Sequence, residues 1–180
     1  MDKLELKENS TQGSISTVIS YNVQTGSWST NYPPLPGARD HAAGTVIGKT
    51  FYVTGGRDHN QFNWKNDTWA LDLSNPTAWV PKASMITARG GLASARIGDK
   101  LYTFGGEGNP NSPDLVFDNV EVYDAISDVW TELPKMSWPR HGMGAVAVGG
   151  RIYVPGGGVR ISAAPTNHFD VFEFGGKRGN

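Results

Sequence analysis

Short apolar runs separated by glycine-containing turns extend along most of the chain, and this pattern predicts β-strands rather than helices. Neighbouring runs are joined by residue pairs that favour a tight hairpin, namely Gly48-Lys49, Gly98-Asp99 and Gly149-Gly150. No window shows an apolar stripe with the helical period of about 3.6 residues. The 23 glycines, 11 prolines, 6 tryptophans and 6 tyrosines agree with an all-β chain of short strands packed by aromatic side chains.

The strand pattern repeats along the chain. A double glycine follows an apolar run three times, at Gly55-Gly56, Gly105-Gly106 and Gly156-Gly157. One tryptophan and one arginine keep the same spacing of 50 or 51 residues, at Trp28, Trp79 and Trp130 and at Arg39, Arg89 and Arg140. Because independent markers share one period, we predict a repeat protein whose unit is a sheet of four strands, A to D in chain order.

The markers divide the chain into blades and partial blades. The predicted segments are an N-terminal segment with at most one edge strand (1–14), a partial blade with strands C and D (15–38), two full blades (39–88 and 89–138), a partial blade with strands A, B and C (139–174) and a flexible tail (175–180). The alternating run at 3–7 lies about where a strand B is expected. Strand A is rich in small residues, which suits the innermost strand of a blade.

The leading arginine, the double glycine and the Tyr123-Asp124 pair followed by Trp130 resemble the kelch motif. The resemblance covers residues 15–174 and implies an all-β kelch β-propeller with one four-stranded antiparallel sheet per blade. The last copy departs most from the motif. It has a third glycine at Gly158 and Pro155 where the other copies have Thr54 and Phe104, and it lacks the tryptophan strand.

The predicted strands make about three to three and a half blades, whereas propellers generally use four to eight. Three explanations are open. The chain is a fragment of a longer propeller, or two copies close one ring as a homodimer, or the strands form a small four-bladed ring within one chain. Two copies give six blades with one surplus strand C in each chain. Since exposed blade edges favour association, we expect this half propeller to be completed by a second copy.

Antiparallel blades place the long loops between strands B and C on one face, together with the start of strand A. This face receives arginine, acidic side chains and all four histidines, His168 among them. The candidate binding residues are Arg39, His41, Arg57, Asp58, His59, Trp64, Arg89, Glu107, Arg140, His141 and Arg160. The arginines that repeat in register also fit a structural role between blades, and Trp64 also fits a blade cap.

Two functions fit these residues. The kelch resemblance implies a non-catalytic binding or scaffold module whose loops contact a protein partner or a small polar or anionic ligand. Sialic-acid mutarotases resemble this chain too, and that resemblance implies a sugar enzyme in which Glu107 acts with Arg57 or Arg160. Galactose oxidase is also kelch-like, but its copper cofactor needs a cysteine. The chain has no cysteine, so we do not expect that chemistry. The sequence also has no phosphate-binding loop and no HExxH motif, and we expect no cofactor.

Charge and hydropathy bear on whether the chain binds nucleic acid, associates with a membrane or carries a signal peptide. The 16 basic and 17 acidic residues leave no net field for nucleic acid or for an anionic membrane. Met1–Ser10 is charged and does not resemble a signal peptide, and no apolar run approaches the ~18–20 residues that cross a bilayer. The histidines come from separate blades, so no metal site is expected. Ligand identity and cell compartment stay open.

Overall fold

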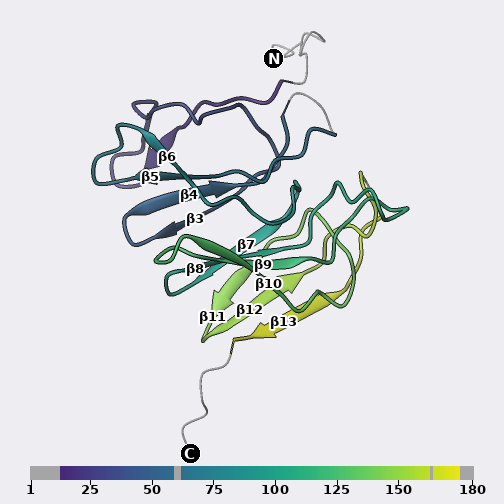
Figure 1. The fold of residues 1–180 in the computed structure, drawn as a ribbon. Helices are drawn as coiled ribbons and strands as arrows, with labels where there is room; N and C mark the ends of the chain where they lie inside the picture. The colour runs from purple at the N-terminus through teal and green to yellow at the C-terminus, as the bar shows by residue number, and fades with distance from the viewer. Residues whose placement is uncertain (1–12, 59–61, 163, 175–180) are drawn as a thin grey trace, which may run out of the picture.

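A computed structural model describes residues 13–58, 62–162 and 164–174 and shows an all-β chain. Its strands form four antiparallel sheets that follow one another along an arc (Figure 1). Two sheets have four strands, and an incomplete sheet lies at each end of the arc. The predicted all-β fold of antiparallel sheets, with two full and two partial sheets, is therefore confirmed. No helix that could cross a membrane occurs in this part of the chain.

The strands occur in the predicted order. The N-terminal hairpin contains β1 (Ser20–Asn22) and β2 (Ser27–Ser29). The first full sheet contains β3 (Ala43–Ile47), β4 (Thr50–Thr54), β5 (Thr68–Asp72) and β6 (Trp79–Lys82). The second full sheet contains β7 (Ala93–Ile97), β8 (Lys100–Phe104), β9 (Val120–Asp124) and β10 (Val129–Leu133). The last sheet contains β11 (Val146–Val148), β12 (Arg151–Pro155) and β13 (Phe169–Glu173).

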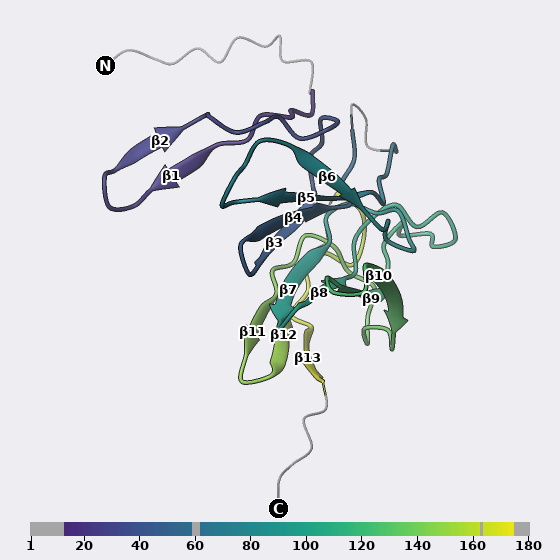
Figure 2. The same cartoon turned by 60° about the vertical axis from the view of Figure 1, so that its left-hand side comes forward.

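The N-terminal hairpin differs from the sequence-based expectation in length. The pattern of the partial blade predicts a strand C that extends over 14–23, but β1 has only 3 residues. It pairs with β2 alone, and the hairpin projects from the end of the arc (Figure 2). A strand with one short neighbour gains few ladder hydrogen bonds, which explains its length. The strand expected at 3–7 lies outside the described residues.

Apolar side chains fill the space between successive sheets. Ala43, Ile47 and Tyr52 of the first full sheet pack against Leu101 and Tyr123 of the second. In the same way, the second full sheet packs against the last sheet, where Ile152 and Val154 are fully buried. The repeated tryptophan joins neighbours as well, because the Trp130 indole donates to the carbonyl of Ala83 at 2.9 Å. Apolar packing of the same kind therefore joins the first full sheet to the second and the second full sheet to the last sheet.

Backbone hydrogen bonds join the sheets near the double glycines. The amide of Gly56 donates to the carbonyl of Arg89 at 3.0 Å, and the amide of Gly106 donates to the carbonyl of Arg140 at 2.8 Å. These bonds require close approach of two backbones, which the missing Cβ of glycine permits. The first bond ties the loop after β4 to the segment before β7, and the second ties the loop after β8 to the segment before β11. Those loops carry most of the candidate residues.

Candidate functional site

The arginines that open each repeat are buried inside the sheets. Arg39 and Arg140 are 9% and 0% exposed, and Arg89 is 0% exposed. Each pairs with a carboxylate at or next to strand C of its own sheet. The pairs are Arg39–Asp67 (2.6 Å), Arg89–Glu121 (2.5 Å) and Arg140–Asp170 (2.6 Å). The three guanidinium groups thus hold single sheets together, whereas the sequence suggested contacts between blades or with a ligand.

Arg140 has fewer partners than Arg89. Its Nε and Nη1 atoms are buried without a hydrogen-bond partner among the described residues. Arg89 donates to the hydroxyl of Thr103 at 2.9 Å, but Val154 stands at the corresponding position of the last sheet and has no hydroxyl. Burial lowers the pKa of Arg140, and the nearby Asp170 only partly opposes this effect. The last sheet is therefore the least well satisfied of the three.

The residues that directly follow the double glycines each form a β-bridge with the segment that precedes the first strand of the same sheet. These positions hold Arg57, Glu107 and Gly158 in successive sheets. The Arg57 guanidinium lies 3.0 Å from Oε1 of Glu107, and Nδ1 of His141 lies 3.4 Å from Oε2. Glu107 is 3% exposed, so both of its oxygens are engaged within the protein. An ion-pair network consequently runs across three sheets.

Asp40 and His41 extend this network toward solvent. Nε of Arg57 lies 2.6 Å from Oδ1 of Asp40, and Nδ1 of His41 lies 2.5 Å from the same oxygen. Burial raises the pKa of Asp40, but hydrogen bonds from Arg57, Ser14 and His41 outweigh that effect and hold the pKa below its ordinary value. His41 has a φ of 55° where the corresponding Gly91 has 60°. A side chain held in this region of φ often marks a functional position.

Trp64 caps the neighbouring sheet. Its indole covers Gly108, where an added Cβ would come within 2.6 Å of the ring, and also Gly90, at 3.1 Å. The guanidinium of Arg57 lies 5.8 Å from the ring centre. Asp58 pairs with Lys65 at 2.7 Å and accepts a hydrogen bond from Asn63. Both residues therefore organise the first long loop, and His59 lies outside the described residues.

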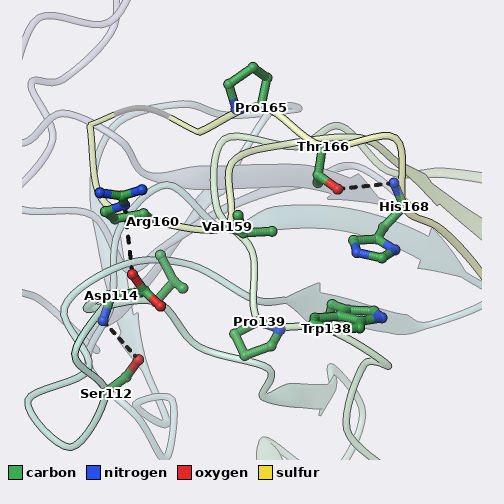
Figure 3. Close-up of a pocket in the computed structure, with 10 residues that line it drawn as sticks. Ser112, Asp114, Trp138, Pro139, Val159, Arg160, Pro165, Thr166 and His168 are labelled. Atoms are coloured by element: carbon green, nitrogen blue, oxygen red, sulfur yellow. Dashed lines mark hydrogen bonds and ion pairs between the residues drawn. The ribbon is translucent and has the colours of Figure 1, made fainter.

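A hollow of about 470 Å³ opens between the long loops of the second full sheet and the last sheet (Figure 3). Its aromatic wall is Trp138 stacked on His168, with ring centres 4.6 Å apart and planes inclined by 13°. Arg160 and Asp114 lie on the opposite side with 3.7 Å between charged atoms, and their side chains are 66% and 53% exposed. Apolar atoms of Val116, Val159 and two prolines complete the lining.

The hollow adjoins the ion-pair network through His141. Nε2 of His141 lies 2.8 Å from the backbone oxygen of Arg160. The structure thus brings together Arg57, His41, Glu107 and His141 in one cluster, with the Arg160 side chain next to it. The sequence did not single out Trp138 or Asp114. One signal was available, because Trp138 is a tryptophan outside the period of Trp28, Trp79 and Trp130.

A metal centre finds no support here. Among the residues that the structure places, no group of three or more histidine, aspartate, glutamate or cysteine side chains could hold an ion. The side chains of the hollow can recognise a ligand through the aromatic wall, the exposed guanidinium of Arg160 and the carboxylate of Asp114 that pairs with it.

Known proteins resemble the chain over most of its length. A family model described as the KLHDC2/KLHL20/DRC7 Kelch-repeats domain matches residues 8–175. Kelch-like protein terF of Aspergillus terreus is 38% identical over 165 residues, which cover 90% of the chain and 35% of that protein. Kelch domain-containing protein 3 of Homo sapiens is 27% identical over 180 residues, covering 92% of the chain and 46% of that protein.

An enzyme also appears among the relatives. N-acetylneuraminate epimerase of Brucella suis is 38% identical over 138 residues, which cover 72% of the chain and 34% of the enzyme. The chain therefore spans about a third to a half of the length of these relatives.

Proposed function

The chain belongs to the kelch-repeat family, and from this premise we propose that it is a non-catalytic binding module that presents one loop-bearing face to a protein partner. We call this surface the loop face and define it by residues 55–58, 62–67, 105–119, 156–162 and 164–168, with Trp138 and His141 beside them. Kelch-domain proteins generally bind protein partners, which supports the proposal.

The hollow at Trp138 carries the proposal. Trp138 is 52% exposed although it is stacked on His168, so one aromatic surface stays open to solvent. Tryptophan and arginine are the residues that most often dominate binding energy at interfaces. Here both line one concave site on loops fixed by rigid sheets, which is where binding residues concentrate. The opposite charges of Arg160 and Asp114 favour a polar peptide segment with an apolar side chain over a purely anionic ligand.

We expect Trp138→Ala to weaken peptide binding by about 30-fold, since truncating a central anchor commonly costs ~2 kcal/mol. The probe is a displayed library of random peptides, selected on the whole chain and then measured by fluorescence anisotropy. Trp28→Ala is the matched control, because Trp28 is an exposed tryptophan at 67% but lies on the N-terminal hairpin. Equal binding to both variants, or a library without any binder, would contradict the proposal.

A sugar-directed activity is the second candidate. The Arg57–Glu107 pair at 3.0 Å is the arrangement that the mutarotase resemblance implies, and one relative is an N-acetylneuraminate epimerase. A catalytic carboxylate must reach its substrate within hydrogen-bonding distance. Glu107 is buried and has both oxygens engaged, which favours a structural role in joining sheets. We therefore rank this candidate second.

The two candidates can be separated with the free sugar acid. We expect the chain to leave the anomer exchange of N-acetylneuraminate, followed by NMR, at its uncatalysed rate. Glu107→Gln is the matched variant, because it keeps the side-chain volume and removes the charge. Acceleration by the unchanged chain that disappears in this variant would establish the enzymatic alternative in place of binding.

Self-association is the remaining part of the proposal. Two sheets of the described chain are complete, and the two incomplete sheets lie at opposite ends of the arc (Figures 1 and 2). Such ends expose strand edges and sheet faces that favour further pairing. We propose that a second copy of the chain supplies the surfaces that complete the ring.

A further inference from the structure

The last sheet exposes an apolar face. In its register, Val146, Tyr153 and Val171 lie opposite one another, and Phe169 lies opposite Pro155 on the same side. The exposed fractions are 54% for Val146, 46% for Val171 and 59% for Phe169. Residues on the other side of this sheet, such as Ile152, are buried against the second full sheet. We call the exposed side the outer face.

Most counterparts of the outer face are buried in the two full sheets, although Thr45, the counterpart of Val146 in the first full sheet, is only partly buried. Ala95, Tyr102 and Val122 occupy the same register positions in the second full sheet and are 7%, 5% and 9% exposed. They pack against the last sheet. In the first full sheet, Tyr52 and Ala70 are 6% and 4% exposed and pack against the second. The outer face is therefore as apolar as the surfaces that a neighbouring sheet covers elsewhere in the chain.

At the other end of the arc, the first full sheet has an apolar surface that is incompletely covered. A hollow of about 340 Å³ lies between the N-terminal segment and the first full sheet, and its lining includes Val18, Leu35, Phe51 and Trp79. In the second full sheet, Leu101 and Trp130 occupy the positions of Phe51 and Trp79. There they share a core cluster with Ala43, Ile47 and Tyr52 of strands A and B, and with Ala70 of strand C, of the preceding sheet. The hollow is thus the place where strands A and B of a preceding sheet belong.

We infer that the outer face of one copy packs into this hollow of a second copy, head to tail. The inference rests on the proposed self-association and names the two surfaces that meet. The outer face offers Val146 and Tyr153 from strands A and B, the strands that the hollow lacks. The contact repeats an interface that occurs twice within one chain, so size and polarity already match. Two such contacts close a ring of two chains.

The edge of the outer face follows the same pattern. Arg151 pairs with Glu173 at 2.9 Å between β12 and β13. Lys100 pairs with Asp124 at 2.6 Å in the corresponding place between β8 and β9. A polar rim around an apolar centre is the usual anatomy of an interface. The charged pair therefore lies at the edge of the contact and leaves its centre apolar.

Ring closure gives six blades, because each chain supplies two full sheets and one half of each of two shared blades. Propellers of four to eight blades are common. Each shared blade would hold β11, β12 and β13 of one copy with β1 and β2 of the other, one strand more than a blade needs. We expect β1 to yield this position, since it has 3 residues and β13 has 5.

Charged substitutions test the two surfaces separately. Val171→Glu changes the outer face, and Ile19→Glu changes the hollow, where Ile19 is 55% exposed. We expect each variant to raise the dissociation constant of the two-chain species at least tenfold in sedimentation equilibrium, because a charge is placed in an apolar contact. Ile126→Glu is the matched control, since Ile126 is 81% exposed on a hairpin turn outside both surfaces.

Mixing the variants separates the inference from the broader proposal. A pair of Val171→Glu and Ile19→Glu chains retains one unaltered contact, so we expect the two-chain species to recover in the mixture. Undiminished dimers of Ile19→Glu would indicate a symmetric contact between outer faces and would overturn the head-to-tail inference. A strictly monomeric unchanged chain would overturn self-association itself. Neither result bears on the loop face, which the Trp138 comparison measures independently.

Discussion

Replacing Glu121 with glutamine should lower the free energy of unfolding by about 3–5 kcal/mol, because it leaves the Arg89 guanidinium buried without a counter-charge. Both side chains are 0% exposed, with Nη1 of Arg89 at 2.5 Å from Oε1 of Glu121. Burial lowers the pKa of Arg89 even though Glu121 favours its charged form. The second oxygen of Glu121 accepts a hydrogen bond from the amide of Ile86 at 3.0 Å. Urea unfolding followed by circular dichroism measures the loss.

Lys100→Gln is the control for this measurement. It removes an ion pair of similar length, 2.6 Å, whose side chains are 46% and 29% exposed. Ion pairs exposed to solvent contribute little to the free energy of unfolding, so we expect almost no change in the urea midpoint. A double variant, Arg89→Met with Glu121→Leu, should recover much of the lost stability because no unpaired charge remains. Equal losses for Glu121→Gln and Lys100→Gln would show that the buried pair has no special role.

The sequence was sufficient to predict the sheets. Three markers in one period, together with hairpin pairs such as Gly48-Lys49, specify where strands begin and how they turn. Each of these features depends on a few neighbouring residues, so it can be recognised in the sequence without a structure. The positive φ of Gly48 and Gly98, 59° and 58°, agrees with the hairpins predicted there.

The candidate site was predictable only in part. Arg57, Glu107 and His141 were placed on one face by counting strands, and the structure brings them together. The role of Arg89 depends on Glu121, a residue 32 positions away that no local pattern connects to it. Trp138 and Asp114 come from segments far apart in the sequence and line one hollow only because the loops pack together. Pairings of this kind follow from tertiary geometry, which a repeat period does not contain.

The second large loss of stability is expected from a substitution in the double glycine Gly105-Gly106. Gly105→Ala should cost about 2–5 kcal/mol of unfolding free energy, from ~1–2 kcal/mol for a left-handed backbone and ~1–3 kcal/mol for overpacking. Gly105 has a φ of 56°, and its added Cβ would collide with the backbone oxygen of Arg140. The same oxygen accepts the hydrogen bond from the amide of Gly106 at 2.8 Å, so relief of the collision separates two sheets.

Gly98→Ala isolates the steric part of that cost. Gly98 has a φ of 58°, almost that of Gly105, but among the described residues no heavy atom other than those of Gly98 and its two chain neighbours lies within 4 Å of its added Cβ. We therefore expect Gly98→Ala to lose only the backbone contribution of ~1–2 kcal/mol. The difference between the two variants in urea unfolding measures how closely the sheets approach at Gly105. If the losses were equal, backbone conformation alone would account for the first glycine of the pair, and close packing of successive sheets would not be needed to explain it.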